Sequence, residues 1–364
     1  SLAYVQESLQ SRRVSGDGPF TARCHQWLER ELGSPALLTH SCTAALEMSA
    51  LLAEIGPGSE VILPSYTFPS TANAFVLRGA TPVFVDIRAD TLNLDESLLD
   101  QALSRQTKAI VAVHYAGVGC AMNAILEFAA EHGLMVIEDA AQAHMSRYRG
   151  KALGTFGAVG CLSFHESKNL MSGEGGALII NDQRLVERAY ILREKGTNRT
   201  AFFNGKVGKY EWLDFGSSYL PSDLIAALLL AQLEDAEAIT ARRVAIWSRY
   251  QDGFAAAERD GLLLRPHPPA DAPPNGHIYY ILLPTADAAR RTQRYLETAG
   301  VEAHTHYVPL HSAPAGRRFG RTATAMPVTE RVAGSLLRLP LHTELQDDDV
   351  EHVIAAVYGA VSSL

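Results

Sequence analysis

Two segments of the sequence carry side chains whose types and positions could do chemistry together. Lys168 follows an apolar run that ends at Ser163, and Gly173, Gly175 and Gly176 come shortly after it. A lysine beyond the end of a buried strand, with glycines that let backbone pack closely behind it, is placed like a lysine that forms a Schiff base. Taken alone, Lys168 could also be an ordinary surface lysine, because most lysines are exposed.

A carboxylate earlier in the chain decides between these alternatives. The apolar run that begins at Val136 delivers Asp139 at its carboxyl end. Pyridoxal phosphate (PLP) needs both residue types: a lysine to hold its aldehyde, and a buried carboxylate to keep a proton on its ring nitrogen so that the ring can accept electrons. Lys168 and Asp139 together therefore indicate a PLP site.

These two segments, and most of the chain around them, resemble the DegT/DnrJ/EryC1/StrS family of sugar-nucleotide aminotransferases. The resemblance runs from about Gly16 to the C-terminus. It is carried by Gly16-Asp17-Gly18-Pro19-Phe20-Thr21, Pro64-Ser65-Tyr66-Thr67-Phe68, Arg193-Glu194-Lys195-Gly196-Thr197-Asn198-Arg199 and His306-Tyr307-Val308-Pro309-Leu310-His311. It implies the α/β fold of fold-type I PLP-dependent aminotransferases, a mostly parallel sheet flanked by helices with a smaller C-terminal α/β domain. It also implies a homodimer with shared active sites.

The periodicity of the chain predicts the same sheet without the family. Short apolar runs, at 61–63, 83–85, 109–113, 134–137 and 177–180 among others, alternate with amphipathic helical segments, which is typical of a parallel sheet covered on both faces. Ligands of such sheets bind outside the carboxyl ends of the strands, where Asp139 and Ser163 fall. We expect a large PLP-binding domain over residues 1–240 and a small domain over 241–364. A long helix from Ser222 to about Arg259 would mark the passage between them.

Ser41-Cys42-Thr43 lies at a junction between a short strand and a helix. Free backbone N–H groups at the start of a helix can bind an anion, although the same residues could be a plain N-cap. The resemblance places the cofactor phosphate against Cys42 and Thr43, with Ser163 closing the site. It also stacks Phe68 on the cofactor ring and gives Gln142 a hydrogen bond to the ring hydroxyl. The alternatives are a core position for Phe68 and a solvated one for Gln142.

The resemblance also suggests residues that contact the substrate. Arg199 and Tyr219 lie in a segment that related enzymes extend into the neighbouring subunit's active site, and a solvated charged surface is the alternative for such basic residues. The chain departs from the family here, because it reads Gly216-Ser217-Ser218-Tyr219-Leu220 where many members carry an asparagine that contacts the partner's cofactor phosphate. Whether Ser218 takes over that contact is open.

Three further residues could face the sugar. His165 is either a core histidine or a sugar contact, and His306 and Tyr307 are either structural or part of a substrate-facing wall. The histidines at 304, 306 and 311 lack an acidic ligand at a suitable spacing, so we expect no metal.

The activity implied by the resemblance is amino transfer from L-glutamate to C-4 of TDP-4-keto-6-deoxy-D-glucose, giving TDP-4-amino-4,6-dideoxy-D-galactose. The alternative is a family member that acts on another nucleotide-linked keto sugar, at a C-3 ketone or with an equatorial C-4 amine product. In either case Lys168 would be both the covalent anchor and the group that moves the proton between the donor α-carbon and the cofactor. Related PLP-dependent dehydratases carry histidine at this position, and Lys168 argues against them.

Composition excludes several other classes. A net charge of −8 and a pI near 5.9 argue against a nucleic-acid partner. The sequence contains neither a long uncharged apolar run nor a basic-then-apolar N-terminal segment, so we expect no membrane association and a cytoplasmic location. Cys24, Cys42, Cys120 and Cys161 are scattered and are expected to be reduced thiols. No G-x-G-x-x-G motif follows the first strand, which argues against a nicotinamide-dependent oxidoreductase.

Overall fold

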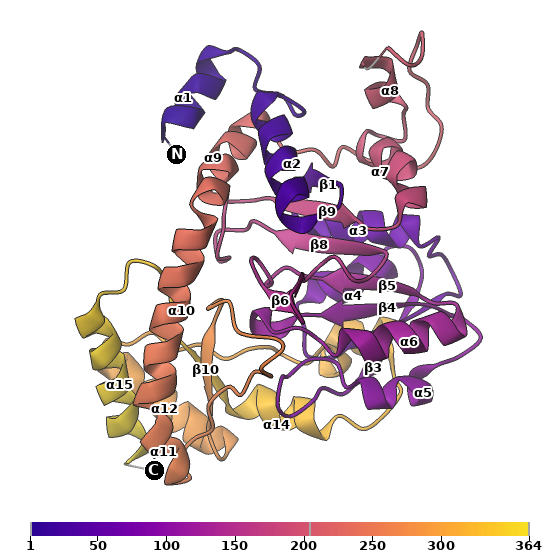
Figure 1. Cartoon of the computed structure of the whole chain (residues 1–364). Coiled ribbons are helices and arrows are strands. Elements are labelled where there is room, and N and C mark those ends of the chain that lie inside the picture. Colours follow the sequence, from indigo (N-terminus) through magenta and orange to yellow (C-terminus); the bar gives the residue numbers. More distant parts are fainter. Residues whose placement is uncertain (1, 204, 363–364) are drawn as a thin grey trace.

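A central sheet organises the larger part of the molecule (Figure 1). The computed structural model describes residues 2–203 and 205–362, and within them eight strands form this sheet in the order β1-β9-β8-β5-β4-β2-β3-β11. Only β9 runs antiparallel to its neighbours. The predicted mostly parallel sheet is thus confirmed. The strands are β1 (Ala36–Thr39), β2 (Glu60–Pro64), β3 (Thr81–Val85), β4 (Thr107–Val113), β5 (Met135–Asp139), β8 (Val159–Ser163), β9 (Gly176–Ile180) and β11 (Arg321–Thr322).

Helices cover both faces of this sheet because its strands are apolar on both sides. Successive residues of β1 face opposite ways, so that Leu38 joins one hydrophobic cluster and Leu37 the other. The first cluster includes buried residues of α2 (Pro19–Leu32), α6 (Met122–His132) and α9 (Asp223–Glu234). The second includes buried residues of α3 (Cys42–Leu52), α4 (Pro69–Val76) and α7 (Val186–Arg193).

The prediction of one continuous helix from Ser222 to Arg259 is wrong, because the segment forms three helices. Three helices follow one another along one side of the molecule (Figure 1): α9, α10 (Ala236–Gly253) and α11 (Ala255–Arg259). The breaks fall at Asp235 and Phe254, whose ψ angles of 9° and 5° lie outside the α-helical range. Aspartate favours such a break because its side chain competes with the helical backbone hydrogen bonds, and Phe254 is fully buried in the C-terminal core.

A second core lies in the C-terminal part of the chain. Strands β10 (Tyr279–Leu282) and β12 (Leu336–Leu339) pair antiparallel, and α10, α12 (Ala286–Thr298) and α15 (Asp347–Val361) pack with them around one hydrophobic cluster. The sequence predicts a strand over 278–283 and helices over 286–299 and 346–361, and the bounds of β10, α12 and α15 lie within a residue of these.

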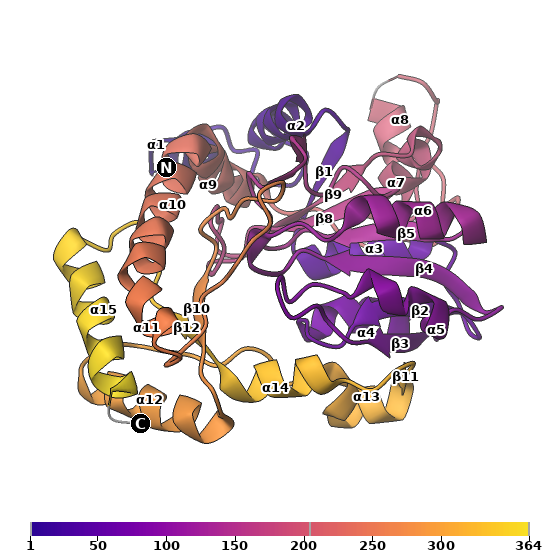
Figure 2. The ribbon, with the colours of Figure 1, turned by 60° about the horizontal axis from the view of Figure 1, so that its bottom comes forward.

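Between β10 and β12 the chain returns to the large sheet. β11 pairs in parallel with β3, and Leu310 and Met326 join the core of the large sheet. Figure 2 shows this excursion, with α13 (Pro314–Phe319) and β11 beside β3 and α14 (Pro327–Ser335) leading back. The two parts of the chain are therefore interleaved, and the division at residue 240 stays a prediction.

The other elements are short or peripheral. They are α1 (Leu2–Gln10), α5 (Leu99–Ala102), α8 (Arg199–Phe203), the two-residue strands β6 (Arg147–Tyr148) and β7 (Lys151–Ala152), and the 3-10 helices η1 (Glu96–Leu98), η2 (Tyr115–Gly117), η3 (Gln183–Leu185) and η4 (Leu310–Ser312). None of the helices among the described residues has the length and apolar character that a bilayer crossing requires.

Candidate active site

One cavity of about 610 Å³ opens where the parallel strands end. Strands β1, β2, β5 and β8 run in the same direction, so the residues that follow each of them meet at one edge of the sheet. The volume is in the range that holds a cofactor or a small ligand. The cavity brings together ten of the residues predicted from the sequence: Cys42, Thr43, Phe68, Asp139, Gln142, Ser163, His165, Lys168, His306 and Tyr307.

Lys168 reaches this cavity from a tight turn after β8. Its backbone N–H donates to the carbonyl oxygen of His165 at 2.9 Å, and its side chain lines the cavity. Burial lowers the pKa of the Lys168 amine from its usual value; the charge of Arg338 acts in the same direction, and Cys42 and Asp139 oppose it. A larger fraction of the amine is then uncharged near neutral pH, which makes it a better nucleophile.

One glycine of the cluster after Lys168 allows backbone to pack closely there. The N–H of Phe164 donates to the carbonyl oxygen of Gly175 at 2.8 Å, so the chain folds back on itself around the lysine. A Cβ on Gly176 would lie 2.5 Å from the backbone nitrogen of Cys42, which a side chain cannot tolerate. Glycine at 176 therefore lets β9 pass against the start of α3.

The start of α3 has the features of an anion site. The Ser41 hydroxyl caps the helix by accepting from the N–H of Ala44 at 3.1 Å, and Ser41, Cys42 and Thr43 all line the cavity. The positive end of the helix dipole thus faces the cavity, as phosphate binding requires. The Thr43 and Ser70 hydroxyls lie 2.8 Å apart beside it. Burial raises the pKa of the Cys42 thiol well above its usual value, so this thiol is neutral and does not repel an anion.

Asp139 is buried, with 6% of its surface exposed, at the end of β5. The Thr71 hydroxyl donates to Oδ2 at 2.7 Å, and the backbone N–H of Ala141 donates to Oδ1 at 3.2 Å. The Thr67 and Thr71 hydroxyls lie 2.8 Å apart. Each carboxylate oxygen keeps accepting capacity after these contacts, so Asp139 can receive a further proton donor from the cavity.

The walls beside Asp139 carry an amide and two aromatic rings. The Gln142 amide oxygen accepts from the N–H of Ala116 at 2.7 Å, and its nitrogen donates to the Tyr307 hydroxyl at 2.8 Å. Phe68 is 58% exposed and lines the cavity, so it does not fill the core. The rings of Phe68 and Tyr307 lie 6.4 Å apart. A flat apolar surface is therefore available to an aromatic ring in the cavity.

His165 is not the buried core histidine that the sequence allowed. Its side chain is 43% exposed, its Nδ1 lies 2.9 Å from the Ser167 hydroxyl, and Glu174 is 3.7 Å from its Nε2. Ser163 is supported from behind, because the buried imidazole of His144 bonds its carbonyl oxygen. Burial lowers the pKa of His144 to about 4, so this imidazole is neutral and donates from Nε2.

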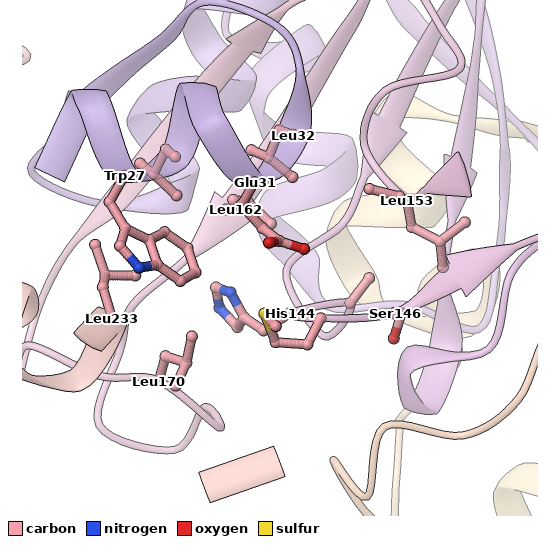
Figure 3. A pocket seen from close by; sticks show the side chains of 13 residues that line it. Trp27, Glu31, Leu32, His144, Ser146, Leu153, Leu162, Leu170 and Leu233 are labelled. Atoms are coloured by element: carbon pink, nitrogen blue, oxygen red, sulfur yellow. The ribbon is translucent and has the colours of Figure 1, made fainter. Parts of the chain in front are cut away.

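A second cavity behind this wall holds only about 20 Å³. Figure 3 shows the His144 imidazole among the side chains that line it, with Trp27 and Leu170 nearby. This space suits roughly one water molecule and no larger ligand. It belongs to the support of the active-site wall.

Two predicted residues lie away from the cavity of their own chain. Arg199 donates to the carboxylate of Glu194 at 2.9 Å, and Tyr219 is buried against His40, with ring centres 6.2 Å apart. Ser218 is exposed in the same region. The resemblance implies that Arg199 and Tyr219 reach a partner's active site, and that role stays a prediction.

A buried polar cluster near Lys168 escaped the sequence analysis. The Asn275 amide donates to the carbonyl oxygens of Gln142 at 2.8 Å and His144 at 2.9 Å. His277 Nδ1 lies 2.9 Å from the Asn169 side-chain oxygen, next to Lys168. This cluster therefore joins the loop after β5 to the loop that carries the lysine. The sequence does show that Asn275 and His277 are polar residues at the end of a proline-rich loop, directly before an apolar strand. That position could have indicated a structural or functional role for them.

Arg338 is another cavity residue that the sequence analysis missed. It lies in β12 between leucines and lines the cavity. A charged residue inside an apolar strand is a signal for function, because burying an unpaired charge is costly.

These residues fit PLP. A lysine amine, a carboxylate held by a buried hydroxyl, a helix N-terminus with hydroxyl groups and a flat aromatic wall together match its aldehyde, ring nitrogen, phosphate and ring. The fit rests on groups that converge from β1, β2, β5 and β8.

The family model that matches this chain, and two solved structures similar to it, are those of aminotransferases. The family described as DegT/DnrJ/EryC1/StrS aminotransferases matches residues 1–358. The spore coat polysaccharide biosynthesis protein SpsC of Bacillus subtilis is 36% identical over 370 residues, covering 99% of this chain and 94% of that protein. Among solved structures, the aminotransferase TlmJ from Streptoalloteichus hindustanus has a TM-score of 0.90 at 35% identity, covering 100% of this chain and 96% of that one. The PLP form of the putative sugar aminotransferase Spr1654 from Streptococcus pneumoniae has a TM-score of 0.90 at 27% identity, with coverages of 100% and 96%.

Proposed function

Because this chain belongs to the DegT/DnrJ/EryC1/StrS aminotransferase family, we propose that it transfers the amino group of L-glutamate to C-4 of TDP-4-keto-6-deoxy-D-glucose. The product would be TDP-4-amino-4,6-dideoxy-D-galactose. The chain is an enzyme whose cofactor is PLP, as the family and the PLP form of a structural relative indicate. The convergence of Lys168 and Asp139 in one cavity is the observation that carries the proposal.

Each of several cavity residues has a separate proposed role in amino transfer. When bound, PLP supplies the electron sink that stabilises negative charge at the donor α-carbon. Asp139, oriented by Thr71, holds the proton on the ring nitrogen. The start of α3 would hold the phosphate, with Thr43 beside it. The Lys168 amine would hold the cofactor's aldehyde at rest and, when free, would move the proton from the donor α-carbon.

Support for a sugar substrate comes from relatives, and support for this particular sugar comes from the sequence. SpsC is named for polysaccharide biosynthesis, and Spr1654 is named as a putative sugar aminotransferase. The C-4 ketone is what the resemblance along most of the chain implies. His165, His306 and Tyr307 line the cavity and are the proposed sugar contacts within one chain.

A visible absorption titration tests the proposal. PLP-loaded protein should lose its yellow colour when L-glutamate is added, as the amino group moves onto the cofactor, and should regain it with TDP-4-keto-6-deoxy-D-glucose. The product, identified by NMR, should carry an axial amine at C-4. An amine at C-3 or an equatorial C-4 amine would favour the alternative sugar. A spectrum that neither glutamate nor a keto sugar changes would contradict the aminotransferase assignment.

We further propose a homodimer with shared active sites, supported by an exposed apolar segment. Phe203, Tyr210, Trp212, Leu213 and Phe215 are each more than half exposed, and Trp212 reaches 81%. Apolar side chains grouped in this way mark an interaction surface. Figure 1 shows the segment beginning at α8, which stands away from the central sheet. Arg199 and Tyr219 flank this segment, and we propose that they contact the active site of the second copy, as the resemblance implies.

Replacing Trp212 with aspartate is expected to weaken dimerisation by about 100-fold, because a large aromatic at the centre of an interface carries much of its binding energy. Sedimentation velocity across a concentration series measures the change. The matched control is Leu264→Asp, since Leu264 is 50% exposed in the C-terminal part of the chain and should leave the dimer intact. An unchanged sedimentation coefficient in Trp212→Asp, or a monomeric wild type, would contradict this interface.

A further inference from the structure

His277 is a buried histidine that lines the active-site cavity together with Lys168. It lies at the end of the proline-rich loop, two residues before β10. The buried guanidinium of Arg243, on α10, donates to the carbonyl oxygens of Gly276 at 2.9 Å and His277 at 2.8 Å. The backbone that carries the imidazole is therefore held in place from a neighbouring helix.

The hydrogen bonds around Asn169 determine which ring nitrogen of His277 carries a proton. The side-chain nitrogen of Asn169 donates to the carbonyl oxygen of Asn275 at 3.1 Å. A carbonyl oxygen can only accept, so it is the side-chain oxygen of Asn169 that lies 2.9 Å from His277 Nδ1. Because this amide oxygen also can only accept, Nδ1 must carry the proton and donate it.

The imidazole of His277 is neutral near neutral pH. Burial lowers its pKa well below the usual value, and the charges of Lys168, Arg243, His144 and His306 act in the same direction. A neutral ring with its proton on Nδ1 has a free lone pair on Nε2. No donor among the described residues bonds this Nε2, so it is available to a group in the cavity.

The Lys168 amine is chemically complementary to this nitrogen. It is a donor that lines the same cavity, and it makes no hydrogen bond in the parts of the chain that the structure describes. Its charge acts on the His277 ring, and Asn169, which holds that ring, directly follows Lys168. A donor and an acceptor, each without a partner, therefore lie in the same part of the cavity.

The other two imidazoles that line the cavity have different neighbours. Nδ1 of His165 accepts from the backbone N–H of Ser167 at 3.2 Å. Nδ1 of His306 lies 3.1 Å from the Tyr115 hydroxyl. His277 is the one tied, through an amide, to the segment that carries the catalytic lysine.

We propose that Nε2 of His277 accepts a hydrogen bond from the Lys168 amine while that amine carries the proton taken from the amino donor. The inference rests on the proposed aminotransferase function, because it concerns the proton transfer of that reaction. The amine becomes an ammonium group when it takes the proton, and a buried ammonium needs acceptors. A neutral imidazole stabilises this charge without removing it, so Lys168 can still pass the proton on.

Two substitutions separate the roles of the two ring nitrogens. In His277→Asn the amide can still donate to Asn169 from the position of Nδ1, but nothing replaces Nε2. In His277→Gln the longer side chain places an amide oxygen near the position of Nε2, and the donor to Asn169 is lost. We expect His277→Asn to slow the single-turnover reaction of PLP-loaded enzyme with L-glutamate by about 10- to 30-fold, and His277→Gln to stay within about threefold of the wild type.

The deuterium isotope effect identifies the step that is slowed. With glutamate deuterated at its α-carbon, His277→Asn should show an isotope effect at least as large as that of the wild type, because proton transfer itself is slower. Its apparent Kd for glutamate should stay within about twofold of the wild type. An isotope effect that disappears would overturn the inference.

A measurement without substrate tests the contact directly. In the full chain freed of PLP, the rate at which acetic anhydride modifies Lys168 across a pH series gives the pKa of its amine, with peptide mass spectrometry as the readout. An acceptor at Nε2 stabilises the charged amine, so this pKa should be lower in His277→Asn than in the wild type and unchanged in His277→Gln. Equal pKa values in all three proteins, or the same fall in both variants, would overturn the inference whatever the kinetics show.

Controls separate this inference from its alternatives. His267→Asn removes an exposed imidazole of the same loop that pairs with Glu258, and it should change neither the rate nor the pKa of the Lys168 amine. A weaker apparent Kd for the keto sugar in His277→Asn, with the pKa of Lys168 unchanged, would place a sugar hydroxyl at Nε2 and overturn the inference. A wild type that ignores glutamate contradicts the proposed donor, and the acetic anhydride measurement still decides the contact.

Discussion

The Lys168→Ala enzyme is expected to lose both half-reactions, with a fall in kcat of about 10⁴-fold or more. Alanine removes the covalent anchor of the cofactor and the amine that moves the proton from the donor α-carbon, and general acid–base catalysis alone contributes up to about 10⁴-fold. Single-turnover absorbance with glutamate, and separately with the keto sugar, measures each loss. The side chain lies in the cavity and has no hydrogen-bond partner in the described residues, so the fold should be retained.

A chemical readout that does not depend on turnover accompanies this prediction. Borohydride reduction of the PLP-loaded wild type should fix the cofactor on the peptide that contains Lys168, which peptide mass spectrometry detects. The Lys168→Ala protein should show no such adduct. Lys151 provides the control, because it lies on β7 away from the cavity lining, and Lys151→Ala should keep both the adduct and the activity. An adduct on any other lysine would overturn the assignment of Lys168.

The Asp139→Asn enzyme is expected to retain its fold and to lose about 10²- to 10³-fold in kcat. The amide oxygen can still accept from the Thr71 hydroxyl, so local structure should be kept. Asparagine has no charge to hold the proton on the ring nitrogen, and removal of one preorganised electrostatic interaction typically costs this much. Both half-reactions should slow together, because both depend on the same ring.

Reconstitution with an altered cofactor makes this prediction specific. A PLP analogue methylated at the ring nitrogen is permanently positive there, so it should restore part of the activity of Asp139→Asn and give no gain in the wild type. Thr71→Val tests the positioning of Asp139, and a smaller loss of about tenfold is expected when the 2.7 Å contact to Oδ2 is removed. If the analogue fails to help Asp139→Asn, the carboxylate acts through something other than the ring nitrogen.

Sequence patterns were sufficient for the sheet and for the residues that follow its strands. The apolar run before Asp139 and the run before Ser163 are β5 and β8, and the carboxyl ends of parallel strands meet at one edge by geometry alone. Residues predicted to follow these strands therefore lie close together in the structure. The resemblance added the phosphate and ring contacts of Cys42, Thr43 and Phe68, all of which line the cavity.

Contacts between distant segments could not be predicted in this way. Asn275 joins the loops around Gln142 and Lys168 only because a long loop passes beneath both, and loop paths leave no periodic signal. Arg338 reaches the cavity because β12 lies in the small sheet that faces it, a matter of packing between cores. The break at Asp235 also escaped prediction. Ala236, directly after it, still joins the core of the large sheet, and α10 joins the C-terminal core only from Ile246 onward.

The excursion of the chain between β10 and β12 sets the order in which the enzyme can be completed during its synthesis. β11 adds to β3 only after residue 322 has left the ribosome, although β3 ends at Val85. His306, Tyr307 and Arg338 join the cavity equally late, and contacts across so long a stretch form slowly. A nascent chain that already contains Lys168 and Asp139 therefore lacks one wall of the site. The proposed substrate contacts are thus completed late in synthesis, after the residues proposed to hold PLP have been made.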